Sequence, residues 1–208
     1  MLAIAGGKGG VGKTTTALGL AAALPGRPLV VDADRDMPDL HALAGVPRAD
    51  TAQPHECPDH DCRVLPAPGA DAPSAEQRLT RVRAAYRTTD ERSGQPSVLV
   101  DTPAGASVDA ATPLRAVDGV VLVSTACAPA LRNTAKTASM ARAVGTPVVG
   151  AVLTRTAVRP PNAETLFDCP VLAVVPDAPG RPLDTPRVRE RYEAAAAALG
   201  GASEASHV

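Results

Sequence analysis

Short, uninterrupted runs of Val, Leu, Ile and Ala recur along the chain, separated by longer segments whose apolar residues follow helical spacing. Continuous apolar runs of this kind are typical of strands buried on both faces, as in parallel sheets. We expect strands at residues 2–5, 28–31, 63–65, 97–100, 120–123, 147–153 and 171–175.

The segments between these runs predict helices. Ser74 is a candidate N-cap, with Leu79, Val82 and Tyr86 at helical spacing behind it. Strands separated by helices favour an α/β fold with a mostly parallel central sheet and helices on both faces. We expect helices at residues 14–24, 38–44, 74–87, 129–144 and 185–199, one domain over 1–200 with an irregular Cys- and His-containing loop at 47–62, and a frayed tail at 201–208.

Composition narrows the class of protein. A length of 208 residues, 45% of them hydrophobic, suits a single domain with a sizeable core. The net charge of −1 gives no basic excess that would favour nucleic acid, and no apolar run approaches the ~18 residues of a membrane span. The first residues lack the basic start of a signal peptide, and the four cysteines are too scattered for a disulfide framework. We expect a cytoplasmic protein in which the isolated Cys127 and Cys169 are buried and structural.

Residues 7–14 read GKGGVGKT and fit the phosphate-binding pattern G-x-x-x-x-G-K-[ST], between a predicted strand and a predicted helix. Glycines let the backbone curl so that its N–H groups point at phosphate oxygens, and the N-terminus of the following helix adds partial positive charge. Lys13 can reach the β- and γ-phosphates, and the Thr14 hydroxyl can bind Mg²⁺. The sequence therefore predicts a nucleoside triphosphate site, a P-loop, at this position.

Lys8 narrows the kind of P-loop to which this motif is similar. Only three of the 21 basic residues are lysines, so lysine is not the usual basic residue of this chain. The segment KGGVGKT resembles the deviant Walker A motif of the MinD/ParA family of P-loop ATPases and is closer to its MinD-like members. The resemblance implies that Lys13 contacts the nucleotide of its own subunit, and that Lys8 reaches the nucleotide of a partner subunit. The excess of Asp over Glu suggests a halophilic or archaeal MinD-like protein, although the near-neutral net charge weakens that inference.

Two further segments resemble the switch regions of this family. Residues 30–46, VVDADRDMPDLHALAGV, resemble switch I, which implies that Asp34 orients the attacking water and that Asp32 supports the metal site. Residues 98–105, VLVDTPAG, resemble the Walker B strand and switch II. Asp101 would hold Mg²⁺ through its water shell, and Gly105 would allow a backbone movement that depends on the γ-phosphate.

The segments AVLTRTAVRP and VVPDAP, at residues 151–160 and 174–179, resemble the base-recognition segments of the family more loosely. The resemblance thus implies three expected catalytic residues, Lys8, Lys13 and Asp34, and three expected Mg²⁺ residues, Thr14, Asp34 and Asp101. The residues expected to bind nucleotide are Gly7, Lys8, Gly9, Gly10, Val11, Gly12, Lys13, Thr14, Thr15, Asp32, Thr154, Arg155, Pro176 and Asp177.

The resemblance implies a slow, Mg²⁺-dependent ATPase that converts ATP and water to ADP and phosphate. ATP would drive formation of a homodimer, an activator protein would stimulate hydrolysis, and the switch would position or partition DNA or another intracellular cargo. Three alternatives stay open: a nucleotide-binding regulatory scaffold with little hydrolysis, a metal- or cluster-carrying ATPase that uses Cys57 and Cys62, and a P-loop ligase or kinase. No residue is diagnostic for the last of these.

The chain also departs from the family pattern. Its predicted last helix lacks the stripe of large apolar residues that attaches MinD proteins to membranes, so no membrane anchor is expected. ParA proteins bind DNA non-specifically through surface basic residues. A candidate cluster exists, for which a solvated helix face is the favoured interpretation: Arg78, Arg81, Arg83, Arg87 and Arg92.

Residues 55–62, HECPDHDC, offer a complete N₂S₂ set for zinc at His55, Cys57, His60 and Cys62. The spacing differs from that of zinc fingers, and so short a loop has little freedom to wrap a metal. We therefore favour a solvated insertion that contacts a partner.

Overall fold

An eight-stranded sheet forms the centre of the protein in a computed structural model that describes residues 1–48, 53–69, 73–86, 98–105 and 107–204. Its strand order is β3-β4-β2-β5-β1-β6-β7-β8. All neighbouring strands pair in parallel except β3 and β4, which pair antiparallel at one edge. The strands are β1 (Leu2–Ala5), β2 (Leu29–Asp32), β3 (His55–Glu56), β4 (Arg63–Leu65), β5 (Val98–Asp101), β6 (Gly119–Thr125), β7 (Val148–Thr154) and β8 (Val171–Val174).

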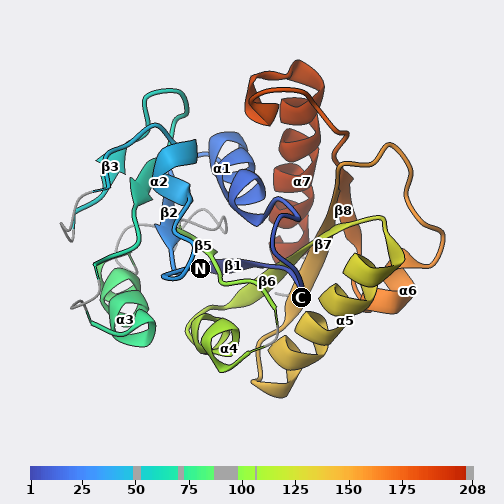
Figure 1. The fold of residues 1–208 in the computed structure, drawn as a ribbon, viewed down its shortest axis with the longest axis horizontal. Helices are drawn as coiled ribbons and strands as arrows, with labels where there is room; N and C mark the ends of the chain where they lie inside the picture. The colour runs from blue at the N-terminus through green and yellow to red at the C-terminus, as the bar shows by residue number, and fades with distance from the viewer. Residues whose placement is uncertain (49–52, 70–72, 87–97, 106, 205–208) are drawn as a thin grey trace.

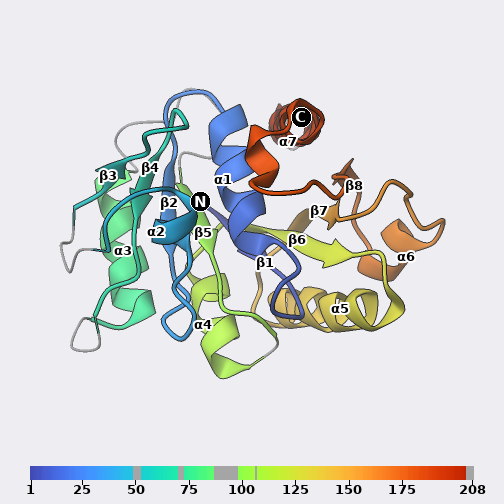
Figure 2. The same ribbon diagram turned by 45° about the horizontal axis from the view of Figure 1, so that its top comes forward.

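Helices cover both faces of this sheet, with α1 and α7 on one face and α3, α4 and α5 on the other (Figures 1 and 2). The predicted single-domain α/β fold with a mostly parallel sheet is thus confirmed. The helices are α1 (Lys13–Ala23), α2 (Leu40–Leu43), α3 (Ala75–Tyr86), α4 (Val108–Arg115), α5 (Ala128–Ala143), α6 (Ala163–Phe167) and α7 (Pro186–Glu204), with a 3₁₀ turn η1 (Pro182–Asp184) before α7.

Each face has its own apolar core. On the α1 side, Tyr192 of α7 packs directly over Gly19 of α1, where an added Cβ would lie 2.4 Å from the tyrosine ring. The Tyr192 hydroxyl also shares a hydrogen bond of 3.2 Å with the Thr16 hydroxyl. Because α1 directly follows the glycine loop, this contact ties the C-terminal helix to the predicted phosphate site.

Most predicted elements are present, with ends that differ by a few residues. Ser74 caps α3 as predicted, since its Oγ accepts a hydrogen bond from the Gln77 N–H at 3.2 Å. The sequence patterns missed β3, α6 and η1, which are too short for periodicity, and α4, which contains Pro113. Helix α7 continues to Glu204, so its end lies beyond the predicted 199. The boundary of the domain at 200 stays a prediction, and residues 205–208 lie outside the described residues.

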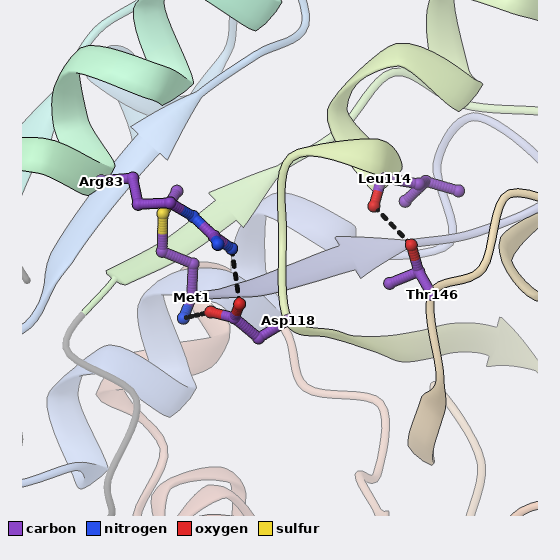
Figure 3. A network of polar contacts seen from close by, with 5 residues as sticks. All are labelled: Met1, Arg83, Leu114, Asp118 and Thr146. Carbon is purple, nitrogen blue, oxygen red and sulfur yellow. Dashed lines mark hydrogen bonds and ion pairs between the residues drawn. The ribbon is translucent and has the colours of Figure 1, made fainter.

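Polar contacts join α3 and α4 to the amino ends of the strands (Figure 3). The Asp118 carboxylate accepts from the amino group of Met1 at 2.7 Å and from the Arg83 guanidinium at 2.5 Å. Burial alone would raise the pKa of Asp118, but these two cations lower it below its usual value. The Thr146 hydroxyl donates to the Leu114 carbonyl at 2.7 Å. These contacts fix one end of the sheet, and the predicted site residues gather at the other.

Candidate functional site

The glycine loop connects β1 to α1 at the carboxyl end of the sheet. Gly10 and Gly12 have φ angles of +74° and +88°, a left-handed conformation that glycine adopts at little cost. Gly12 is the N-cap of α1, and no side chain caps the helix. The N–H groups of its first turn are therefore available to an anion, which the helix dipole also favours.

Neighbouring elements hold this loop in place. The Thr154 hydroxyl, at the end of β7, donates to the Val11 carbonyl at 2.6 Å, and the Gly105 N–H donates to the Gly6 carbonyl at 3.0 Å. Gly7 lies so close to α5 that an added Cβ would be 2.1 Å from a backbone atom of Asn133. The loop is thus preformed by contacts with β7, the segment after β5, and α5.

Gly7→Ala is expected to lower the free energy of unfolding by at least about 1–3 kcal/mol, because the new methyl group would overlap the α5 backbone. Gly9→Ala is the matched control in the same loop, since a Cβ there meets nothing within 4 Å. Urea unfolding of both variants without nucleotide measures the difference. Equal stabilities for the two would contradict this packing.

The two predicted lysines have opposite surroundings. Lys13 is 8% exposed, at the start of α1, whereas Lys8 is exposed on the outer side of the loop. Lys8 lies near Cys127, the N-cap of α5. Hydrogen bonds that involve Thr125 and Ala130 lower the pKa of the Cys127 thiol, and the Lys8 charge lowers it further. Cys127 is exposed, so its predicted burial is wrong. Cys169 is half-buried, and burial raises the pKa of its thiol to about 11.

Three aspartates gather beside Lys13. Asp32 and Asp101 are register partners at the carboxyl ends of β2 and β5, and both are almost fully buried. The Asp32 carboxylate accepts from the N–H groups of Asp34 at 3.0 Å and Leu40 at 3.4 Å, so it holds residues 34–40 in place. Asp34 is half-buried, and its Oδ1 accepts from the Met37 N–H at 3.0 Å. The predicted catalytic and metal carboxylates therefore lie at one edge of the sheet.

Asp101 fits a role toward a metal-bound water. Its Oδ1 is buried and has no hydrogen-bond partner among the described residues, and the Thr14 hydroxyl is close enough to lower the pKa of this carboxyl. An unpartnered buried acceptor is costly, so a donor at this position would be stabilising. No group of three or more His, Cys, Asp or Glu in the described part of the chain could hold a metal. Mg²⁺ would thus need phosphate oxygens as additional ligands.

Burial raises the pKa values of two of these carboxyls. The pKa of Asp101 rises to about 7, against the opposing effects of the Thr14 hydroxyl and the Lys13 charge. The pKa of Asp32 rises to about 6, against the two backbone hydrogen bonds that it accepts. Between pH 3.8, the ordinary pKa, and these values, the folded protein holds protons that the unfolded chain has released.

The stability of the nucleotide-free protein is therefore expected to fall as pH rises from about 4 to about 7, and to level off above that. Asp101→Asn should flatten this decline and raise the free energy of unfolding at about pH 8, because the buried charge is gone. Asp36→Asn, in the exposed segment after β2, is the matched control. Urea titrations across this range measure the effect. A wild-type stability that rises throughout it would argue against the raised pKa values.

A second part of the site is an open pocket of about 340 Å³ next to the loop. Residues from the ends of β7 and β8 meet there, among them the four residues of the base-recognition prediction. Arg155 has a φ angle of +52°, a strained conformation for a residue with a side chain, and its side chain is exposed. Sequence patterns did not single out Tyr192 as a member of this pocket. The lining consists of Gly12, Thr15, Thr154, Arg155, Pro176, Asp177, Ala178, Pro182 and Tyr192.

Thr154 has a different environment from its neighbours in this pocket. It is 4% exposed, and its hydroxyl donates to the carbonyls of Val11 and Ser124. The Thr154 hydroxyl proton is therefore already hydrogen-bonded within the protein. We interpret Thr154 as a residue that positions the loop, and Arg155 as the more accessible of the predicted pair.

Among the candidate DNA-binding arginines that the structure describes, Arg78 and Arg83 are engaged in contacts within the protein. Arg78 is half-buried and donates to the backbone carbonyls of Asp32, Leu65 and Pro66, which makes it a clamp between α3 and the sheet. Arg83 binds Asp118, as described above, and Arg81 is exposed. The remaining two, Arg87 and Arg92, lie outside the described residues.

The segment at 55–62 is only partly the solvated insertion that the sequence suggested, because Glu56, Pro58, Asp59 and Asp61 are exposed but its two cysteines are not. Cys62 is fully buried and Cys57 is 8% exposed, and both belong to the core on the α1 side of the sheet. His60 lies near α7, where burial lowers its pKa, and His55 is half-buried. In the described part of the chain, the four candidate zinc ligands do not form a group that could hold a metal ion.

Helix α7 supplies residues to the core on the α1 side of the sheet. Val188, Tyr192, Ala195 and Leu199 are buried against α1 and the sheet. Within the described ranges, no helix is both long and apolar enough to cross a bilayer.

Comparisons with known proteins agree with this geometry. Residues 2–180 match the CobQ/CobB/MinD/ParA nucleotide binding domain. An uncharacterized ATP-binding protein of Methanocaldococcus jannaschii is 28% identical, over 98% of this chain and 89% of that protein. The cell division ATPase MinD of Pyrococcus furiosus is 26% identical with a TM-score of 0.77, covering 99% of this chain and 98% of that one. MinD of Pyrococcus horikoshii, solved with Mg-ADP, shares the fold at 23% identity and a TM-score of 0.74, over 99% and 95% of the two chains.

Proposed function

The chain belongs to the CobQ/CobB/MinD/ParA nucleotide-binding domain family, and from this premise we propose that it is an Mg²⁺-dependent ATPase that works as an ATP-driven dimerisation switch. The observation that carries the proposal is the arrangement at the carboxyl end of the sheet. A preformed glycine loop, a buried Lys13 and three aspartates converge there. Such a set suits the binding of a nucleoside triphosphate and the activation of water beside it.

Nucleotide binding follows from the loop and from the adjacent pocket. The triphosphate would accept hydrogen bonds from the loop N–H groups and the first turn of α1, with the Lys13 ammonium on the β- and γ-phosphates. The adenine would occupy the pocket beside Arg155, Pro176 and Asp177. Bound Mg²⁺ would neutralise part of the phosphate charge, held by the Thr14 hydroxyl and, through water, by Asp101 and Asp34. The Mg-ADP in the P. horikoshii relative supports this assignment.

Hydrolysis would proceed by in-line attack of water on the γ-phosphate. Asp34 accepts a backbone hydrogen bond that fixes its position, so its second oxygen could orient the water. The Lys13 ammonium and the loop N–H groups would stabilise the charge that develops on the phosphate oxygens. Lys8, which is exposed on the outer side of the loop, would reach the phosphates of a second subunit and complete that site.

The switch would link the γ-phosphate to the shape of the dimer interface. The Gly105 N–H donates a hydrogen bond to the Gly6 carbonyl, so movement of the segment after β5 would also displace the glycine loop. Loss of the γ-phosphate would release that segment and open the dimer. We expect an activator protein and an intracellular cargo as partners, and a cytoplasmic location, to which the four free thiols are suited.

Mixing two inactive variants tests this proposal. Lys8→Ala removes the residue supplied to the partner, and Asp34→Ala removes a residue used within the same subunit. In a mixed dimer, one site has an intact Asp34 and receives an intact Lys8. An equal mixture should recover about a quarter of wild-type phosphate release, because half of the dimers are mixed and each holds one complete site.

Each variant alone should release almost no phosphate, and ATP should shift Asp34→Ala from monomer to dimer on sizing chromatography. No recovery in the mixture, with both variants folded and binding ATP, would refute the action of Lys8 across the dimer. Wild-type phosphate release no faster than that of the two variants would instead favour the regulatory scaffold with little hydrolysis.

A further inference from the structure

Cys57 and Cys62 lie opposite each other at the end of the β3–β4 ladder. The antiparallel register pairs His55 with Val64 and Glu56 with Arg63, so the next opposed pair is Cys57 and Cys62. The Cys57 N–H donates to the Cys62 carbonyl at 3.1 Å, which continues the ladder by one step. Opposed residues in such a ladder have Cα atoms about 4.5–5.5 Å apart, and disulfides span Cα separations of about 4.4–6.8 Å. The backbone is therefore already spaced for a disulfide.

The two side chains also point to the same side of the ladder. Both cysteines are free thiols in the core beneath α2. The Cys57 thiol donates a hydrogen bond to the Ala44 carbonyl at 3.4 Å. Cys57 retains 8% of its surface, whereas Cys62 has none, so an oxidant from solvent would meet Cys57 first.

Ion pairs tether the turn that carries these thiols. Arg27 pairs with Glu56 on one side of the turn and with Asp61 on the other, the latter at 2.8 Å. Arg181 holds Asp59 at 2.7 Å. Such exposed pairs contribute little stability singly, but together they restrict the turn and keep the thiols facing each other.

We propose that Cys57 and Cys62 form a redox site, which a low-molecular-weight disulfide converts reversibly to an intramolecular disulfide. The Cys57 thiolate attacks one sulfur of the reagent, forms a mixed disulfide and releases one thiolate. That thiolate, or solvent, takes the proton of Cys62, whose sulfur then attacks the Cys57 sulfur and releases a second thiolate, which takes up the proton that Cys57 had lost to solvent. The protein loses two electrons and two protons, and the reagent is reduced to two thiols.

The environments of the thiols support this order of events. A hydrogen bond with Cys62 lowers the pKa of Cys57, and burial opposes that effect. The same hydrogen bond, together with burial, raises the pKa of Cys62. Because Cys57 is also the thiol that retains some exposed surface, it is the attacking thiol, and the fully buried Cys62 is the resolving one.

Oxidation would also act on α2. Once Cys57 has lost its S–H, the Ala44 carbonyl at the C-terminal end of α2 loses a hydrogen-bond donor. At the other end of this helix, the Leu40 N–H donates to the Asp32 carboxylate at 3.4 Å. Helix α2 thus connects the thiol pair to the aspartates of the candidate site. The disulfide itself does not depend on ATP hydrolysis, and only an effect on turnover rests on the proposed function.

The test treats the reduced, full-length protein with glutathione disulfide, alkylates the remaining thiols with N-ethylmaleimide and maps tryptic peptides by mass. Both cysteines fall in one peptide, residues 49–63. After oxidation this peptide should carry no N-ethylmaleimide, and its mass should be about 2 Da below that of the reduced, unalkylated peptide. Dithiothreitol should reverse the change. Cys62→Ser should retain glutathione on Cys57, whereas Cys62 in Cys57→Ser should react at least about ten times more slowly, since it is buried. Cys169→Ser is the matched control and should leave the disulfide intact.

Two outcomes would overturn the redox site. One is a peptide 49–63 that stays doubly alkylated after the exposed Cys127 has been fully glutathionylated, because the oxidant was then active. The other is stoichiometric Zn²⁺ binding that protects both thiols and is removed by a chelator, which would assign the pair to a metal. Hydrogen exchange tests the link to Asp32: the α2 amides should exchange faster in the oxidised than in the reduced protein, and equal rates would refute that link.

Discussion

Lys13→Ala is expected to weaken ATP binding by about 100-fold or more, which corresponds to about 2.7 kcal/mol. The Lys13 ammonium is buried beside Asp101, at the start of α1, and would lie against the β- and γ-phosphates. Without this ammonium, the phosphate charge would lie in a buried place with neither a cation nor water to compensate for it. Titration with a fluorescent ATP analogue measures the affinity, and circular dichroism verifies that the variant is folded.

Two further variants make this result specific. Lys136→Ala removes an exposed lysine from α5 and should leave the affinity within about twofold of wild type, as for most surface substitutions. Lys13→Arg keeps the charge but replaces a compact ammonium with a planar guanidinium, so it should not restore binding. Affinity within a few fold of wild type for Lys13→Ala would mean that the glycine loop does not bind the triphosphate.

Asp34→Ala is expected to lower phosphate release by about 100-fold or more, with ATP affinity changed only a few fold. Asp34 is half-buried, next to Asp32 and Asp101, and one of its oxygens is fixed by the Met37 N–H. The other oxygen would orient the attacking water, so the substitution should affect turnover rather than binding. Single-turnover phosphate release, with the affinity measured separately, distinguishes the two effects.

Asp34→Asn separates the charge from the local structure, because an amide oxygen can still accept from the Met37 N–H. It should be as slow as Asp34→Ala if the carboxylate acts on water. Asp36→Ala, two residues further along the exposed segment, should hydrolyse ATP at the wild-type rate. Near-wild-type turnover in Asp34→Asn would reduce Asp34 to a structural role in the segment after β2.

The sequence alone determined the fold class and the position of the phosphate loop. Continuous apolar runs separated by helical segments indicate a buried parallel sheet, because both faces of such strands are covered. The pattern at residues 7–14 is equally local, since a strand, a glycine turn and a helix that follow each other directly must form one connected unit. The ends of β2 and β5 were likewise readable, and parallel strands bring their terminal aspartates to the same edge.

Only the tertiary structure decided what lies beside these elements. The Thr154 hydroxyl donates a hydrogen bond to the glycine loop. Tyr192 packs over Gly19 and shares a hydrogen bond with Thr16, which lies 176 positions earlier in the chain. No local pattern encodes such contacts, because they depend on strand order and on which helix covers which face.

The cysteines illustrate the same division. Their positions suggested a solvated loop at 57 and 62 and burial at 127, and the structure reversed both expectations. A two-residue strand pair is too short to leave a periodic signal, yet its register buries Cys57 and Cys62 opposite each other. Exposure of Cys127 follows from its place at the first residue before α5, at the carboxyl end of the sheet, next to the loop. The sequence thus determined which segments carry the chemistry, whereas strand order, register and helix packing decided which side chains meet, because those contacts join residues far apart in the chain.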